Sequence, residues 1–525
     1  MDIQFIGTGL AIGLAGLGVA AGQGFLIYKV MGLIGRNPRM SSFFLMGAIL
    51  GVALVESAAI YGLVVAMQLM SETMKFAEPL AAVGAGLAIG LTGLGVGIGE
   101  GILIAKGLEA TDMNPENRTK ILSLMVLFVA LVESSAIYGL VIALQILGDA
   151  NTISGFAAVG ASLAIGLTGL GVGIGEGMLA QQTLFEIGKD DKKTKLLLPF
   201  SILAIALIES SAIYGLIIAL KSLSSSAGIA LIGSGLAIGL AGLGVSLGEA
   251  NLLKKGVQVL ASDQPQPTDS KKLIPMAILG VALVESAAIY ALVIALKIVG
   301  DGSAGEAAIG AGLAIGLAGL GVSLGEGIVG TKAIEAGDIE NLDFGKIMTF
   351  MILAIALVES AAIYGLIISL QILGTTFAHP YAALGLAFAI GLSAFGVGIG
   401  EGILAGRALE SASKRPQYTG SLLTTMILGI ALVESVAIYG LLVAMQLLST
   451  PEIVASTSIA GGIAIGMTAL GVGLFEGLLV AGGLTAMNRN PKNKTKNLTF
   501  MILFLALVEA VAIYGLFLAM QVIAK

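Results

Sequence analysis

The stretch ILSLMVLFVALVESSAIYGLVIALQIL, from Ile121 to Leu147, is almost entirely apolar and has an acidic residue, Glu133, near its centre. A run of about 20 apolar residues is long enough to cross the ~30 Å hydrocarbon layer of a membrane as a helix. A carboxylate at that depth costs at least ~2.5 kcal/mol to insert, so an intramembrane Glu is a functional residue by default. The stretch therefore predicts a transmembrane helix with an acidic site at its middle.

The same motif, (V/I)E(S/A) with a Tyr five residues after the Glu, recurs through the whole chain at intervals of 74 to 77 residues. Its acidic residues are Glu56, Glu133, Glu209, Glu285, Glu359, Glu434 and Glu509. A Gly-rich apolar span precedes each one, as in GAGLAIGLTGLGVGIGEG from Gly84 to Gly101. A fixed period of this kind indicates an internal repeat. We predict seven transmembrane helical hairpins, or 14 helices, at residues 1–73, 74–150, 151–225, 226–299, 300–374, 375–449 and 450–525.

Composition agrees with an all-α integral membrane protein. Of the 525 residues, 57% are apolar and 11% are charged, and the mean hydropathy is +1.01. Lipid allows only helices or closed barrels, and the spans lack the alternation of a barrel strand. The absence of cysteine excludes disulfides and thiolate chemistry, and no block of basic residues suggests a nucleic-acid partner.

Basic residues predict the orientation. Of the 27 Lys and Arg, all but Lys75, Lys221, Lys297 and Lys525 fall in or beside the loop within a hairpin. The positive-inside rule places these loops in the cytoplasm and both termini on the opposite face. Every hairpin then has the same orientation, which argues against an inverted-repeat transporter and suggests a ring.

The first span of each hairpin is rich in glycine. In the second hairpin Gly93, Gly97 and Gly101 recur every four residues, and such stripes let helix backbones approach closely in lipid. Thin first spans beside thicker second spans predict the inner and outer layers of a cylinder. Seven hairpins alone would close a very tight cylinder, so we expect two chains per ring.

A polar side chain of the first span is expected at the same depth as the second-span Glu. These residues are Gln23, Glu100, Glu176, Glu249, Glu326, Glu401 and Glu476. Around Glu133, Ser134 and Tyr138 lie on one flank of the helix. Carboxylates and a hydroxyl at one level suit a hard cation. The alternative is that the carboxyl groups only hold helices together by hydrogen bonds, which Ser or Asn would do at lower cost.

The residues resemble the membrane-rotor c subunit, or proteolipid, of rotary F-, A- and V-type ATPases. The resemblance covers nearly the whole chain seven times. In the first hairpin it rests on GLGVAAGQG (Gly16 to Gly24), GRNP (Gly35 to Pro38) and ALVESAAIYGL (Ala53 to Leu63).

In sodium-binding members of this family the ion is held by the first-span Gln or Glu and the second-span Glu, with a hydroxyl from the adjacent hairpin, and a Tyr orients the site. Carried over in hairpin order, the resemblance implies Gln23, Glu56, Ser57 and Tyr61; Glu100, Glu133, Ser134 and Tyr138; Glu176, Glu209, Ser210 and Tyr214; Glu249, Glu285, Ser286 and Tyr290; Glu326, Glu359, Ser360 and Tyr364; Glu401, Glu434, Ser435 and Tyr439; Glu476, Glu509 and Tyr514. Ala510 replaces the Ser in the last hairpin, so one site per chain is expected to lack its hydroxyl and to bind Na⁺ more weakly.

The function implied is rotary ion transport, with one Na⁺ carried per hairpin and H⁺ as the alternative cargo. The implied partners are a stator a-type subunit with its Arg, central-stalk subunits at the cytoplasmic loops, further copies of the chain, and membrane lipid. The chain has no nucleotide site, so ATP chemistry is expected on partner subunits. A rival interpretation is a self-contained cation channel, but a channel needs a polar stripe along its length, whereas these spans are polar at one depth.

Overall fold

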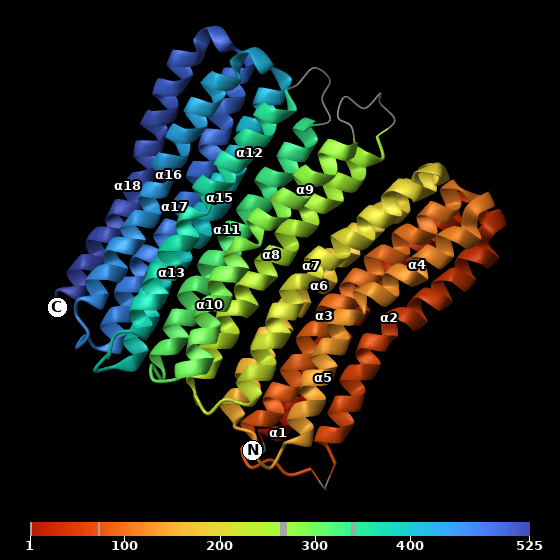
Figure 1. Cartoon of the computed structure of the whole chain (residues 1–525), viewed down its shortest axis with the longest axis horizontal. Helices are drawn as coiled ribbons and strands as arrows, with labels where there is room; N and C mark the ends of the chain where they lie inside the picture. Colours follow the sequence, from red (N-terminus) through yellow and green to blue (C-terminus); the bar gives the residue numbers. More distant parts are fainter. Residues whose placement is uncertain (1–2, 72–73, 263–269, 338–342) are drawn as a thin grey trace. The chain divides into compact units, whose positions relative to one another are not determined.

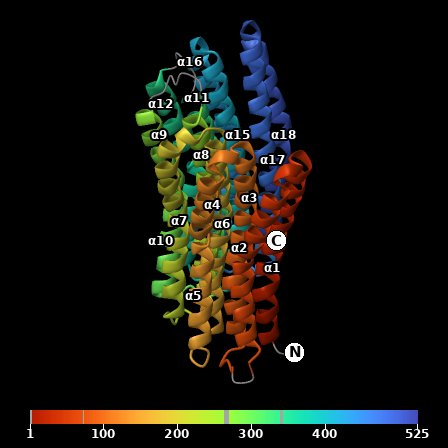
Figure 2. The ribbon, with the colours of Figure 1, turned by 90° about the vertical axis from the view of Figure 1, so that its right-hand side faces the viewer.

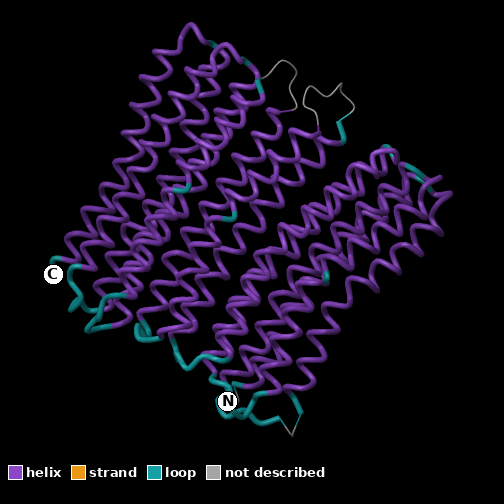
Figure 3. Tube along the Cα trace, in the orientation of Figure 1, coloured by secondary structure: helices purple, strands orange, loops and turns teal. Residues whose placement is uncertain are grey.

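The computed structural model describes residues 3–71, 74–262, 270–337 and 343–525. In these ranges the regular secondary structure is helical throughout (Figure 3). The first spans are α1 (Gln4–Arg36), α3 (Leu80–Met113), α6 (Gly155–Lys189), α8 (Ala230–Leu260), α11 (Ala307–Gly337), α14 (Ala383–Ala387) continued by α15 (Ser393–Lys414), and α17 (Ala455–Arg489).

The second spans are α2 (Ser41–Leu69), α4 (Arg118–Val132) with α5 (Ser134–Gly148), α7 (Thr194–Leu223), α9 (Ser270–Val284) with α10 (Ser286–Asp301), α12 (Phe344–Val358) with α13 (Ser360–Leu373), α16 (Thr419–Leu448) and α18 (Lys494–Ile523). The three paired segments meet at a mid-span Glu whose backbone stays in the right-handed helical region, with φ −63° and ψ −22° at Glu133. Each pair is thus one span. The described residues include 14 helices long and apolar enough to cross a membrane, which confirms the predicted fold class.

Short, regular turns join the two helices of a hairpin. After α1, Asn37 leaves the helical conformation, and Pro38 begins a single 3₁₀ turn that leads into α2. Proline suits the first helical position because its missing N–H would have no partner there. The same turn follows α3, α15 and α17, at Pro115, Pro416 and Pro491. The connection between the two antiparallel helices of a hairpin is therefore only a few residues long.

The chain divides into two compact units. Unit 1 holds residues 1–235 and 249–263, and unit 2 holds residues 236–248 and 264–525. In unit 1, α1, α3 and α6 pack side by side, and the second spans cover them, with α2 lying against both α1 and α3 (Figure 1). The pairing of α1 with α2 is visible from the side as well (Figure 2). First spans thus form one layer and second spans the other.

Glycine makes the first-span layer possible. A Cβ at Gly22 of α1 would overlap the carbonyl oxygen of Gly97 in α3. In lipid no hydrophobic drive brings helices together, so close backbone packing is a main source of association. Of the residues in the most apolar part of α3, 72% are accordingly buried, against 44% in the second span of the same hairpin. Second-span residues such as Ile137 and Val141 stay exposed, as expected of a lipid-facing layer.

In unit 2, α11, α15 and α17 form the first-span layer, and α13, α16 and α18 pack onto it. One irregularity interrupts it. Residues Phe388–Leu392 form a π-helical turn between α14 and α15. Its start coincides with Ala387, where the second hairpin has Gly86, and a Cβ at Gly86 would overlap the backbone of Gly7. The third hairpin has Ser162 at this position and keeps a regular α-helix, so loss of the glycine alone does not explain the π turn.

Replacing Gly22 with leucine is expected to destabilise the chain by about 1 to 3 kcal/mol, because the new side chain must push α1 away from α3. Thermal unfolding of the detergent-solubilised protein, followed by circular dichroism, measures the effect. Gly32→Leu is the matched control, since a Cβ at Gly32 meets nothing within 4 Å. Equal destabilisation by both substitutions would contradict this packing.

Candidate functional site

The mid-span glutamates receive hydrogen bonds across hairpins. The Tyr61 hydroxyl of α2 donates to Glu133 Oε1 at 2.6 Å, and the Tyr138 hydroxyl of α5 donates to Glu209 Oε1 at 2.7 Å. Unit 2 repeats the arrangement in Tyr290 to Glu359, Tyr364 to Glu434 and Tyr439 to Glu509, at 2.5, 2.5 and 2.6 Å. Each of these tyrosines thus serves the Glu of the following hairpin.

The serine beside the Glu belongs to the same arrangement. The Ser435 hydroxyl lies 2.7 Å from Glu509 Oε1, the oxygen that also accepts from Tyr439. The sequence motif pairs each Tyr with the Glu of its own hairpin, and the structure differs on this point. Because the Ser435 hydroxyl of the preceding hairpin lies within reach of Glu509, Ala510 does not remove the hydroxyl beside Glu509.

The first-span glutamates lie beside the second-span glutamates, as the counting of helix lengths predicted. Glu100 is fully buried, and its carboxyl interacts electrostatically with that of Glu133 and with Tyr61. Glycines flank Glu100 on both sides, which leaves room for the neighbouring helices. The equivalent pairs are Glu176 with Glu209, Glu326 with Glu359, Glu401 with Glu434 and Glu476 with Glu509. Each site therefore combines two carboxyl groups of one hairpin with the Tyr hydroxyl of the preceding one, and at Glu509 the Ser435 hydroxyl joins them.

Many of these buried oxygens have no hydrogen-bond partner. Both carboxyl oxygens of Glu100, Glu176, Glu326, Glu401 and Glu476 are unpartnered, as are the hydroxyl oxygens of Ser57, Ser134, Ser286 and Ser360. A buried polar atom without a partner is costly and requires an explanation, such as an ion or a water. Among the residues that the structure describes, no three His, Cys, Asp or Glu side chains come together. The site thus offers two carboxylates and hydroxyl oxygens, a donor set that fits a hard cation.

The first hairpin presents an incomplete site. Gln23 Nε2 lies 3.3 Å from the Val52 carbonyl oxygen, and Glu56 is exposed, whereas Glu133 and Glu209 are half-buried. A cavity of about 230 Å³ opens beside Gln23 and Glu56 and is lined by Ile12, Val19 and Ile60 among others. In the fourth hairpin, Glu249 and Glu285 belong to different units. The arrangement of the site therefore rests on the five sites that lie within one unit, those of Glu133, Glu209, Glu359, Glu434 and Glu509.

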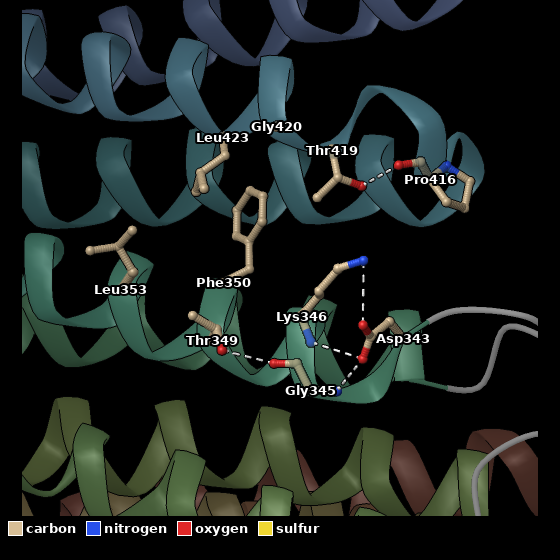
Figure 4. Close-up of a pocket in the computed structure, with 10 residues that line it drawn as sticks. All are labelled: Asp343, Gly345, Lys346, Thr349, Phe350, Leu353, Pro416, Thr419, Gly420 and Leu423. Atoms are coloured by element: carbon tan, nitrogen blue, oxygen red, sulfur yellow. Dashed lines mark hydrogen bonds and ion pairs between the residues drawn. The ribbon is translucent and has the colours of Figure 1, made fainter.

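A larger groove lies away from these carboxylates. It has a volume of about 610 Å³ and lies between α12 and α16 at their loop ends (Figure 4). Asp343 Oδ1 accepts from the backbone N–H groups of Gly345 and Lys346 and so caps α12. The hydrogen bond from the Lys346 side chain holds the pKa of the Asp343 carboxyl below its usual range. This groove takes no part in the mid-span site.

Tandem transmembrane hairpins whose mid-span carboxylates are completed by the preceding hairpin define a class of ion-carrying membrane subunit. The family of the ATP synthase C subunit matches seven segments, at residues 6–69, 83–146, 159–220, 232–298, 309–372, 384–447 and 459–522. The chain belongs to this family and is a rotor c/K subunit of a rotary ATP synthase.

Individual relatives agree. The A-type ATP synthase K subunit of Methanocaldococcus jannaschii is 34% identical over 220 residues, which is 41% of this chain and 93% of that protein. The ATP synthase c subunit of Syntrophobacter fumaroxidans is 35% identical over 86 residues, or 16% of this chain and 93% of its own length. The ATP synthase c subunit of Bacillus thuringiensis is 47% identical over 58 residues, or 11% and 81%. These findings confirm the resemblance stated from the sequence.

Replacing Tyr138 with phenylalanine tests the direction of pairing. Carbodiimides modify protonated carboxyl groups, and loss of a donor disfavours the ionised form. We expect Glu209 to be labelled about tenfold faster, since a hydrogen bond to a charged group is worth at least ~1.5 kcal/mol, while Glu133 keeps its rate. Mass spectrometry of the labelled peptides gives both rates. Tyr28→Phe, at an exposed position, is the control, and acceleration at Glu133 in place of Glu209 would contradict the assignment.

Proposed function

We propose that each hairpin carries one Na⁺ on its mid-span site and that the chain couples Na⁺ flow to rotation of a rotor ring. The observation that carries this proposal is the set of unpartnered buried carboxyl oxygens beside Glu133, Glu209, Glu359, Glu434 and Glu509. The ligands proposed are the two glutamates of one hairpin and the Ser hydroxyl of the preceding one, with the Tyr fixing the orientation of the second-span carboxylate.

The number of oxygens favours Na⁺ over H⁺. One proton can be shared between two carboxyl groups, but it leaves the serine hydroxyl and the remaining carboxyl oxygens without a partner. A hard cation takes several oxygen ligands at once and so satisfies more of them. Beside Glu133, for example, both carboxyl oxygens of Glu100 are unpartnered, and so is the Ser57 hydroxyl of the preceding hairpin. An ion-loaded site with one carboxyl group protonated is neutral, which suits its passage through lipid.

Rotation then follows from alternate loading and release. A stator a-type subunit admits each site to one aqueous half-channel, where its Arg attracts the bared carboxylate, and the site reloads from the other half-channel. Central-stalk subunits contact the cytoplasmic hairpin loops, where most basic residues lie. All seven hairpins keep the second-span Glu, so every hairpin carries an ion. More ions per turn suit ATP synthesis at a low driving force, and ATP chemistry resides on partner subunits.

Carbodiimide labelling of the assembled ring, with and without Na⁺, tests this function. At a Na⁺ concentration ten times the dissociation constant only about a tenth of the sites stay free. We therefore expect labelling of the second-span glutamates to slow about tenfold, with no such effect from K⁺ at the same concentration. Labelling that follows pH and ignores Na⁺ would show that the cargo is H⁺. No labelling at these glutamates would contradict an ion site.

A further inference from the structure

The two end hairpins depart from the repeat at three positions beside the ion site. Gln23 stands where the other hairpins have Glu, Ala510 where they have Ser, and Phe475 where they have Gly. The glycines at the Phe475 position in the other hairpins are Gly22, Gly99, Gly175, Gly248, Gly325 and Gly400. These exceptions lie at opposite ends of the sequence, so each one alone has no evident meaning.

Packing within the chain shows which neighbour each position faces. The glycine before the first-span polar residue faces the following hairpin, since a Cβ at Gly22 would overlap Gly97 and one at Gly400 would overlap Gly473. The Ser beside the second-span Glu faces the same way, as Ser435 does toward Glu509. Phe475 and Ala510 therefore face whatever follows hairpin 7.

The opposite face of a hairpin meets its predecessor. Glu100 and Glu133 of hairpin 2 both interact with Tyr61 of hairpin 1. By the same geometry Gln23 and Glu56 face whatever precedes hairpin 1. The uncovered faces of hairpins 7 and 1 thus carry all three exceptions.

Both sides of this junction are uncovered in the chain. On hairpin 7, Tyr514 is 69% exposed and Phe475 is 61% exposed. On α1, a Cβ added at Gly9, Gly13, Gly16 or Gly24 meets nothing within 4 Å. Their equivalents in α3, which are Gly86, Gly90, Gly93 and Gly101, all pack against α1. The open face of α1 therefore has the same glycines that, in α3, receive the first span of the preceding hairpin.

We propose that hairpin 7 of one copy packs against hairpin 1 of a second copy, and that the ion site completed there differs from the sites within the chain. It contains Glu56, Gln23 and Tyr514 but neither a second carboxylate nor a serine hydroxyl. Phe475 cannot take the close contact that glycine makes, so the two first spans stand further apart there. The occupant is a second copy because the junction continues the in-chain interface and seven hairpins alone would close a very tight cylinder.

One site per chain therefore holds Na⁺ more weakly than the others, an inference that rests on the proposed function. Loss of the Ser hydroxyl as a ligand of the charged ion weakens binding about tenfold or more. The ring then has one weak site at each junction between copies. It fills last as the Na⁺ concentration rises.

The protection of each Glu by Na⁺ against carbodiimide labelling tests the weak site. The assembled ring is labelled with carbodiimide at fixed pH over a Na⁺ titration, and half-protection is read for each Glu. We expect Glu56 to need about tenfold more Na⁺ than Glu133 or Glu359. Equal protection of Glu56 and the others would overturn the inference. Protection of none of them by Na⁺ would instead overturn the proposed Na⁺ function, so the two failures are distinct.

Two substitutions test which Glu each serine hydroxyl serves. Ala510→Ser is expected to lower the Na⁺ needed at Glu56 several-fold and to leave Glu509 unchanged. Ser435→Ala is the matched control within the chain and is expected to raise the Na⁺ needed at Glu509 and to leave Glu434 unchanged. A response of Glu509 to Ala510→Ser, with none at Glu56, would overturn the junction.

Cysteine cross-linking tests the second copy, because the chain has no cysteine of its own. Within the chain, a Cβ at Gly93 would lie 2.8 Å from the Ala15 Cβ, so Ala15→Cys with Gly93→Cys is the control pair and forms a disulfide inside one chain. The equivalent junction pair is Gly16→Cys with Thr468→Cys. In the assembled ring this pair is expected to give covalent multimers on a non-reducing gel. Cross-linking only within single chains, or none while the control pair reacts, would overturn the proposal.

Discussion

The carboxylate in the middle of each second span is the constraint on which the structure depends. Such a group is stable in a membrane only when neighbours satisfy it. In this chain the neighbours come from the preceding hairpin, as Tyr61 and Tyr138 show for Glu133 and Glu209. A hairpin alone holds half a site. The hairpins must therefore be held side by side at a fixed height, and short turns and glycine contacts do this.

The glycines of the first spans serve the same requirement. A tyrosine of one second span reaches the Glu of the next only if the first spans between them stay close. The overlap that a Cβ at Gly22 or Gly400 would cause shows how little room is left. The layer of thin helices thus sets the spacing at which the hydroxyls of Ser435 and Tyr439 meet Glu509. The packing of the first spans therefore determines the geometry of the ion site.

Much of this could be predicted from the sequence. The period of the Glu motif gave the hairpins, hydropathy gave the spans, and helix length placed Glu100 beside Glu133. The direction of the Tyr61 hydrogen bond could not be predicted, because in a repeat every Tyr stands five residues after one Glu and at a constant offset from the next. The π turn at Phe388–Leu392 could not be predicted either, because no sequence motif marks it.

Fusion of seven hairpins into one chain lets the sites differ. Identical separate subunits must all carry the same residues, whereas a fused chain can change one hairpin alone. Three such changes lie at the ion sites. Gln23 takes the place of the first-span Glu, Phe475 precedes Glu476, and Ala510 follows Glu509. If the proposed junction site forms, the sites of one rotor are equivalent in position and unequal in chemistry.

The central claim is that each hairpin, completed by its predecessor, binds one Na⁺. Equilibrium binding of radioactive ²²Na⁺ to the purified, assembled ring tests it most directly. The account predicts one Na⁺ per second-span Glu at saturation, with one site in each chain filling at higher concentration than the rest. Absence of saturable Na⁺ binding, or a single Na⁺ per chain, would contradict it.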